Sequence, residues 1–160
     1  MNQTSIFDIM YPKFKINKPI RLIELFSGYG STKLAWNYLN IPVESWKTCE
    51  WAIKSIQAYK DIHFTDDDTD YSKDLSIEEI KKYLSNKGIS NNYNEPMSET
   101  QVNRLSEQQA RTIYNNIFAT HNVVNIQKTK GKDLEITNTD IYIYIYIDIF
   151  FSLPRFKFSW

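Results

Sequence analysis

Cysteine is almost missing from this chain, and so is any excess of charge of one sign. The 160 residues hold one cysteine, Cys49, which excludes an internal disulfide and a cysteine-based zinc site. Lysine and arginine together number 19, and so do aspartate and glutamate, so the net charge gives no electrostatic case for nucleic-acid binding. The hydrophobic content of 42% is enough for a core.

Long apolar runs are missing too. No stretch approaches the ~20 apolar residues of a membrane-spanning helix, and Asp148 interrupts the apolar segment near the C-terminus. The N-terminal residues have neither the basic start nor the apolar core of a signal peptide. We therefore expect a soluble, cytoplasmic protein with no membrane partner.

The first third of the chain alternates between strand and helix patterns. Short apolar runs predict buried strands over 20–26 and 43–51. Helical patterns over 31–40, with Ser31 as N-cap, and over 52–63 follow them. This strand–helix–strand–helix order predicts an α/β protein with a parallel sheet.

The polar middle of the chain, about 64–121, predicts a helical insertion between strands of the sheet. Ser76 and Glu79 form a capping-box pattern ahead of one helix, and Gly88 is a stop signal after it. A second helical pattern covers 98–120 and also opens with a capping box. Its apolar residues fall on one interrupted helical face.

The remaining segments carry weaker signals. Apolar residues over 122–127 predict another strand, and the strict alternation over 140–147 predicts a strand with one Ile face and one Tyr face. His63 and His121 are predicted to be lone residues without partners. The run Asp66–Asp68 predicts a solvated loop rather than a metal site.

The turn after the first strand carries the clearest functional signal. Gly28 and Gly30 let the backbone approach a ligand at the end of a strand, where open α/β sheets bind their ligands. A dinucleotide fingerprint needs a further glycine where this chain has Lys33, which disfavours a nicotinamide or flavin oxidoreductase. Glu50 closes the next strand and can accept hydrogen bonds from ribose hydroxyls, and Trp51 can stack on adenine. This pair indicates a nucleoside ligand without a pyrophosphate, namely S-adenosylmethionine.

These residues resemble the N-terminal half of the bacterial and phage DNA (cytosine-5) methyltransferases. The stretches "LIELFSGYGSTKLAW", "CEWAIKSIQAY" and "GKDLEI" carry the resemblance, which spans most of 20–145. The first motif of the family corresponds to Glu24–Gly30, and the second is the acid that closes the next strand. The third is an Asp-Leu pair that follows Lys132, a residue that departs from the usual pattern.

The resemblance implies an α/β fold, the first half of a Rossmann-like methyltransferase with a helical insertion. It also implies S-adenosylmethionine as cofactor and no metal ligand. Glu50 would bind the ribose, Trp51 and Leu134 would flank the adenine, and Asp133 would accept from the adenine amino group. The implied cofactor-binding residues are Phe26, Ser27, Gly28, Tyr29, Gly30, Glu50, Trp51, Asp133 and Leu134.

The family's catalytic Pro-Cys-Gln turn is expected just after the Ile-Tyr strand, where this chain has "FFSLPRFKFSW". That tail can be back-translated so that a shifted frame encodes Ser-Phe-Pro-Cys-Gln-Asp-Leu-Ser-Leu-Ala. We therefore expect a frameshift, with a lead-in over 1–19, a partial cofactor-binding domain over 20–149 and an out-of-frame tail over 150–160. Cys49 lies inside the second strand without the Pro-Cys context, so we expect a buried thiol and no catalytic residue.

By resemblance, the intact enzyme would transfer a methyl group to cytosine C5 in DNA, in a restriction–modification or phage setting. This chain alone is expected to be inactive. An alternative is a non-catalytic cofactor-binding or regulatory module that acts with a second polypeptide. The uninterrupted strand Ile141–Ile147 is also predicted to self-associate, because an exposed apolar edge pairs with other chains.

Overall fold

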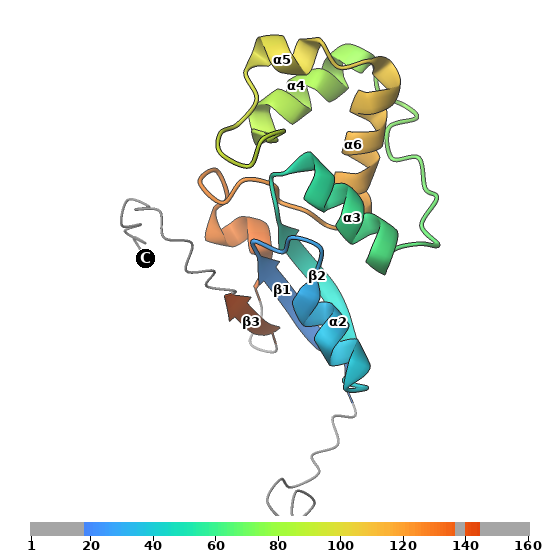
Figure 1. The fold of residues 1–160 in the computed structure, drawn as a ribbon, viewed down its shortest axis with the longest axis vertical. Helices are drawn as coiled ribbons and strands as arrows, with labels where there is room; N and C mark the ends of the chain where they lie inside the picture. Colours follow the sequence, from blue (N-terminus) through green and yellow to red (C-terminus); the bar gives the residue numbers. More distant parts are fainter. Residues whose placement is uncertain (1–17, 137–139, 145–160) are drawn as a thin grey trace, which may run out of the picture.

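A computed structural model describes residues 18–136 and 140–144 of the chain (Figure 1). Two strands and their following helices come first, then a group of helices, then a short 3-10 helix and a third strand. In chain order the elements are β1 (Ile20–Leu25), α2 (Ser31–Tyr38), β2 (Val43–Cys49), α3 (Ile53–His63), α4 (Ile77–Lys87), α5 (Glu99–Asn103), α6 (Glu107–Ala119), η1 (Gly131–Leu134) and β3 (Asp140–Tyr144).

The three described strands form one parallel sheet with the order β2-β1-β3. Leu25 at the end of β1 lies opposite Cys49 on one side and Tyr144 on the other, so the carboxyl ends of the strands meet at one edge. The last four residues of β1 are buried, as its apolar sequence predicts. The mixed α/β class with a parallel sheet is therefore confirmed.

The helix α2 begins one residue earlier than predicted. Gly30 is the N-cap, with a left-handed φ of 81°, and Ser31 is the first helical residue. The main-chain N–H of Gly30 donates to the carbonyl oxygen of Ser27 at 2.8 Å, which closes a tight turn. The predicted role of Ser31 as N-cap is wrong, because this turn continues directly into the helix.

The helical unit, defined here as α4, α5 and α6, lies beyond the carboxyl ends of β1 and β2 (Figure 1). The predicted capping box of α4 is present, with Ser76 and Glu79 bonded reciprocally, and Gly88 ends the helix in a left-handed conformation. A core cluster joins this unit to α3 and its neighbours. Its buried members are Ile56, Ile80, Leu84, Ile89, Val102, Ala110, Ile113, Tyr114, Ile117 and Val124.

The predicted helical pattern over 98–120 is two helices rather than one interrupted helix. The helix α5 ends at Asn103, and a second capping box, Ser106 with Gln109, begins α6. A serine side chain that binds the backbone two or three residues ahead competes with a continuous helix. The break in the apolar face is therefore a true helix end.

The predicted strand over 122–127 is absent from the fold. Asn122 forms one parallel bridge with Thr48 beside β2, but Val124 has a left-handed φ of 74°. The Asn122 side chain accepts from the Val124 N–H at 2.8 Å, and the Asn125 side chain accepts from the Gln127 N–H at 2.9 Å. These local turns take the backbone groups that a strand would need.

The strand β3 covers the first part of the predicted Ile-Tyr strand and forms an edge of the described sheet. Residues 145–160 lie outside the described residues, and so do 1–17. The predicted out-of-frame tail and most of the N-terminal lead-in therefore stay predictions, as does self-association through Ile141–Ile147. In the part of the chain that the structure describes, no helix combines the length and apolar character needed to cross a membrane.

Candidate functional site at the carboxyl edge of the sheet

The turn after β1 is held by the end of β2. The main-chain N–H groups of Phe26 and Ser27 both donate to the carbonyl oxygen of Cys49, at 2.8 and 3.2 Å. Phe26 adopts a left-handed φ of 59°, which is strained for a bulky side chain, and its ring is 45% exposed. Tyr29, in the same turn, is also exposed. The turn therefore presents two aromatic rings beside the strand ends.

The two glycines of the turn have different surroundings. Both have positive φ, 52° at Gly28 and 81° at Gly30. A Cβ atom on Gly28 would meet no atom within 4 Å, so a ligand can approach the backbone there. A Cβ atom on Gly30 would lie 2.2 Å from Nε2 of His63 and 2.6 Å from the ring of Tyr59. Gly30 is therefore needed for packing against α3, and Gly28 leaves open space.

Glu50 connects the turn to the end of the second strand. Its Oε2 accepts from the Gly28 N–H at 3.1 Å, and its Oε1 accepts from the Ala52 N–H at 2.8 Å. The Asn122 side chain holds the Glu50 backbone from both sides, accepting from its N–H at 3.1 Å and donating to its carbonyl at 2.9 Å. The carboxylate is thus fixed by two backbone N–H groups, and the Glu50 backbone is fixed by a third segment.

Burial raises the pKa of Glu50, and the hydrogen bonds from the Ala52 and Gly28 backbone oppose that rise. Each carboxylate oxygen has a second lone pair, so both can accept another hydrogen bond. The site can therefore bind a ligand that offers two adjacent hydroxyl donors, and the backbone donors favour the carboxylate form that accepts them.

A second carboxyl group lies fully buried behind the turn. Glu24, in β1, has 0% of its surface exposed, and its Oε2 accepts from the Tyr59 hydroxyl at 2.6 Å. The same hydroxyl is 3.3 Å from Oγ of Ser45. Burial raises the pKa of Glu24, with Tyr59 and Lys33 acting against it, and burial lowers the pKa of Lys33. This network ties β1, β2 and α3 together beneath the turn.

Two histidines that were predicted to have no partners do have them. Nε2 of His63 lies 3.0 Å from the carbonyl oxygen of Tyr29, so that nitrogen carries the proton and donates. Nδ1 of His121 lies 3.2 Å from the carbonyl oxygen of Ser45. The prediction failed because both partners are backbone carbonyls far away in the sequence.

Two buried polar atoms near the turn have no hydrogen-bond partner among the described residues. They are Oγ of Ser27, in a residue that is 3% exposed, and Oε1 of Glu24. Buried polar groups in proteins are nearly always satisfied, so an exception points to a missing partner. Ser27 belongs to the glycine turn itself, which makes the turn a candidate site for a polar ligand.

The other predicted cofactor-binding residues lie on different sides of this edge. Trp51 is half-buried and packs against the core cluster of the helical unit. Leu134 packs against the sheet cluster of Ile23, Leu25 and Cys49, and its carbonyl accepts from Nε1 of Trp46 at 3.1 Å. The structure brings Gly28 and Glu50 into direct contact, whereas Trp51 and Leu134 join separate clusters.

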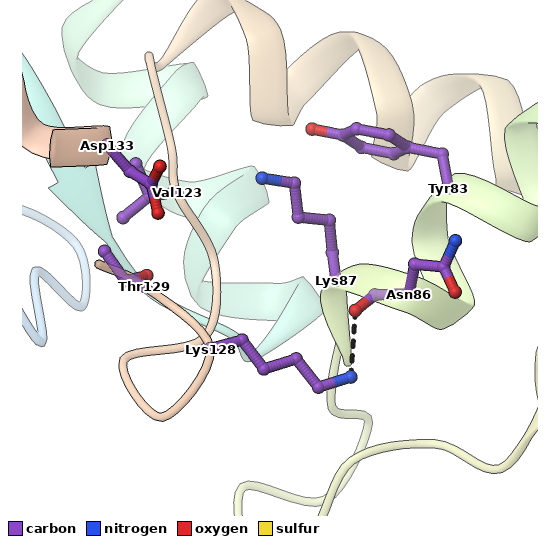
Figure 2. A pocket seen from close by; sticks show the side chains of 7 residues that line it. All are labelled: Tyr83, Asn86, Lys87, Val123, Lys128, Thr129 and Asp133. Atoms are coloured by element: carbon purple, nitrogen blue, oxygen red, sulfur yellow. Dashed lines mark hydrogen bonds between the residues drawn. The ribbon is translucent and has the colours of Figure 1, made fainter.

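Asp133 lines a cavity of about 250 Å3 between α4 and the segment 123–133 (Figure 2). Its Oδ2 accepts from the Lys130 N–H at 2.7 Å, which leaves Oδ1 available. Val123, the residue after Asn122, lines the same cavity and packs on the sheet cluster. The full lining is Tyr83, Asn86, Lys87, Val123, Lys128, Thr129 and Asp133.

Cys49 is the buried thiol that its position predicts. It is 2% exposed, and burial together with the nearby Glu50 charge raises its pKa to about 12. A nucleophilic cysteine needs an accessible, stabilised thiolate. This thiol has neither property, and its Sγ lies 3.5 Å from the Val124 carbonyl oxygen, to which it donates.

Sequence reasoning missed the residues that hold the site from behind: Tyr59, His63 and Asn122. Tyr59 and His63 are four residues apart in α3 and therefore share a helix face. That spacing is visible in the sequence, but it does not indicate what the two side chains contact. Comparison of the chain with models of known protein families and with curated proteins finds no match.

Proposed function

We propose that this chain is the S-adenosylmethionine-binding half of a DNA (cytosine-5) methyltransferase with a Rossmann-like fold. The observation that carries the proposal is the hydrogen bond from the Gly28 N–H to Glu50 Oε2. It joins the glycine turn after one parallel strand to an acid that closes the next, at the sheet edge where α/β proteins bind nucleosides. Both segments resemble motifs of the methyltransferase family, and this resemblance is why we interpret Gly28 and Glu50 as a site for S-adenosylmethionine.

The arrangement of the sheet supports the proposal. In the methyltransferase family the strand that precedes the catalytic turn lies beside the first strand, and β3 here pairs with β1. The bridge from Asn122 to Thr48 places the segment after α6 on the far side of β2. The spatial order, from the segment after α6 through β2 and β1 to β3, therefore agrees with the first half of a methyltransferase sheet.

The residues present fit the cofactor. Glu50 offers two carboxylate oxygens to the two ribose hydroxyls, and the open space at Gly28 allows close approach. Ser27 supplies a buried hydroxyl without a partner among the described residues. Trp51 and Leu134 would contact the adenine, and Asp133 would accept from its amino group. When bound, the cofactor would supply a methyl group activated by its sulfonium centre.

Methyl transfer to DNA would require residues that this chain does not supply, in a larger assembly. The 160 residues contain a single cysteine, and it is buried. The same observation favours the second candidate, a non-catalytic cofactor-binding or regulatory module that acts with a second polypeptide. In both cases DNA would be the substrate of the complete enzyme, in a restriction–modification or phage setting.

Cofactor binding can be tested by calorimetric titration of the chain with S-adenosylmethionine. We expect measurable binding that Glu50→Ala weakens by about tenfold or more, because charge-assisted hydrogen bonds to the ribose are lost. Glu44→Ala is the matched control, since Glu44 is exposed on β2, the strand that Glu50 follows. Equal affinities in Glu50→Ala and the wild type would contradict the assigned role.

An assay of methyl transfer distinguishes a complete enzyme from both candidates, the truncated enzyme and the non-catalytic module. We expect no incorporation of labelled methyl groups into cytosine-containing DNA by this chain alone, because Cys49 is inaccessible. Transfer above background that Cys49→Ser abolishes would contradict the proposal. Transfer that appears only after addition of a second polypeptide would favour the module over a decayed enzyme.

A further inference from the structure

Lys87 directs its ammonium group into the cavity between α4 and the segment 123–133 (Figure 2). It forms no hydrogen bond or ion pair with another described residue. The contact that holds it is the ring of Tyr83, whose centroid lies 5.5 Å from Nζ. The lysine is partly exposed.

Lys128 is the second lysine of the cavity, and its ammonium group already has a hydrogen-bond partner. Its Nζ donates to the carbonyl oxygen of Asn86 at 2.8 Å, in the last turn of α4. A cation at this place offsets the partial negative charge of a helix C-terminus. Asp133, across the cavity, accepts from the Lys130 backbone. The lining thus holds two lysines against one aspartate, which leaves one positive charge in excess.

The Tyr83 hydroxyl adds a hydrogen-bond donor beside this cation. It lies on the same side as the Lys87 ammonium in Figure 2, and no bond joins it to another of the residues drawn there. Burial raises the pKa of Tyr83 to about 12, so the phenol keeps its proton at neutral pH. An ammonium and a phenol that line the same cavity can both donate to an anion with oxygen acceptors.

We propose that this cavity binds the phosphate group of a nucleotide, with Lys87 as its charged ligand and the Tyr83 hydroxyl as a second donor. A phosphate monoester carries about 1.5 to 2 negative charges at neutral pH, together with several acceptor oxygens. The cavity volume of about 250 Å3 is larger than a phosphate ion needs. It lies below the roughly 300–1,000 Å3 of typical ligand pockets, which favours one nucleotide unit over a longer ligand.

This inference does not rest on the proposed cofactor, although the two proposed sites meet at one residue. S-adenosylmethionine contains no phosphate, and Asp133 is the one residue that both proposals use. The phosphate can come from a free mononucleotide or from the end of a nucleic-acid strand, and the two sources share the same chemistry at Lys87. Both are therefore compared in the test.

The experiment is a calorimetric titration of the full chain with adenosine monophosphate, adenosine, and a single-stranded oligonucleotide with or without a 5′-phosphate. We expect adenosine monophosphate to bind more tightly than adenosine by about tenfold, and added salt to reduce the difference. Binding of the phosphorylated oligonucleotide alone would assign the strand end as the source. Failure of both phosphorylated ligands to bind would overturn the proposal.

The variants Lys87→Met and Lys87→Arg test the assigned residue, and Lys73→Met, in an exposed loop, is the matched control. We expect phosphate-dependent affinity to fall about tenfold in Lys87→Met, to be retained in Lys87→Arg and to be unchanged in Lys73→Met. Thermal unfolding of each variant checks that the fold is intact. Loss of affinity in Glu50→Ala rather than Lys87→Met would place the nucleotide at the glycine turn and overturn the proposal.

Discussion

The main-chain N–H of Gly28 donates to Oε2 of Glu50 at 3.1 Å, although 22 residues separate them in the chain. The two groups meet because β1 and β2 are parallel neighbours, so both residues follow strands that end at the same edge. Asn122 fixes the Glu50 backbone from a third segment. The carboxylate therefore has a structural role in the turn as well as its proposed role toward the ribose.

Replacement of Glu50 should separate these two roles. Glu50→Ala removes the acceptor for two backbone N–H groups, and we expect a loss of about 1–3 kcal/mol in the free energy of unfolding. Glu50→Gln keeps one acceptor oxygen and should lose less. Urea unfolding of both variants and the wild type measures the difference. Equal stability of Glu50→Ala and the wild type would show that the carboxylate does not hold the turn.

The two glycines of the turn should respond differently to a methyl group. Gly30→Ala places a Cβ atom against His63 and Tyr59 at φ 81°, so strain and overpacking add. We expect it to lose about 2–5 kcal/mol, from about 1–2 for the left-handed backbone and about 1–3 for the clash. Thermal and urea unfolding provide the measurement.

Gly28→Ala is the matched variant, because its Cβ atom would meet nothing within 4 Å. Only the backbone term of about 1–2 kcal/mol applies, so the chain should stay folded. S-adenosylmethionine should nevertheless bind more weakly, since the methyl group enters the open side of the turn. A larger loss of stability in Gly28→Ala than in Gly30→Ala would contradict the packing described for the turn.

The fully buried Glu24 should make stability depend on pH. Its folded-state pKa lies above 4.5, so the unfolded chain ionises first as the pH rises. The free energy of unfolding should therefore fall from pH 4.5 up to the folded-state pKa and change no further from this group above it. Glu24→Gln does not titrate and keeps an acceptor for the Tyr59 hydroxyl.

The measurement is the difference in unfolding free energy between the wild type and Glu24→Gln at several pH values. Subtraction removes the contributions of other groups, including Glu50, whose pKa is also raised. We expect the wild type to lose stability relative to the variant as the pH rises through this window. A constant difference, or one that grows in favour of the wild type, would contradict the raised pKa of the buried Glu24 carboxyl.

The local elements of the fold were predictable because each has a local signal. The strand β1 is an uninterrupted apolar run, and the capping boxes that begin with Ser76 and Ser98 mark the helix starts. The break before α6 was missed although Ser106 carries the same signal, because apolar spacing across it suggested continuity. Where a capping serine and a continuous apolar spacing disagree, tertiary packing decides whether the helix ends.

The contacts of the site could be predicted only where the parallel topology brings residues together. Gly28 and Glu50 follow neighbouring strands, so their approach followed from the strand order. The bond from Tyr59 to Glu24 spans 35 positions and depends on how α3 lies against the sheet. The cavity at Lys87 depends on a loop whose turns are set by Asn122 and Asn125, and no periodic pattern indicates its path.

The labelling rate of the single thiol, Cys49, measures how often the structure opens at this edge of the sheet. Cys49 is 2% exposed and its pKa is raised to about 12, so the reactive thiolate is scarce in the folded chain at neutral pH. We expect an aromatic disulfide reagent to label it only through opening of the structure. In the folded chain the labelling rate should therefore fall well below that of the urea-unfolded chain, which serves as the reference.

The labelling rate also reports on the residues that hold this edge. Glu50→Ala and Gly30→Ala should both speed the reaction, because each lowers the free energy of opening around the carbonyl of Cys49, which binds the turn. Glu44→Ala, on the exposed face of β2, should leave the rate unchanged. Rapid labelling of the wild type at neutral pH would contradict the burial of Cys49 and reopen its exclusion as a nucleophile.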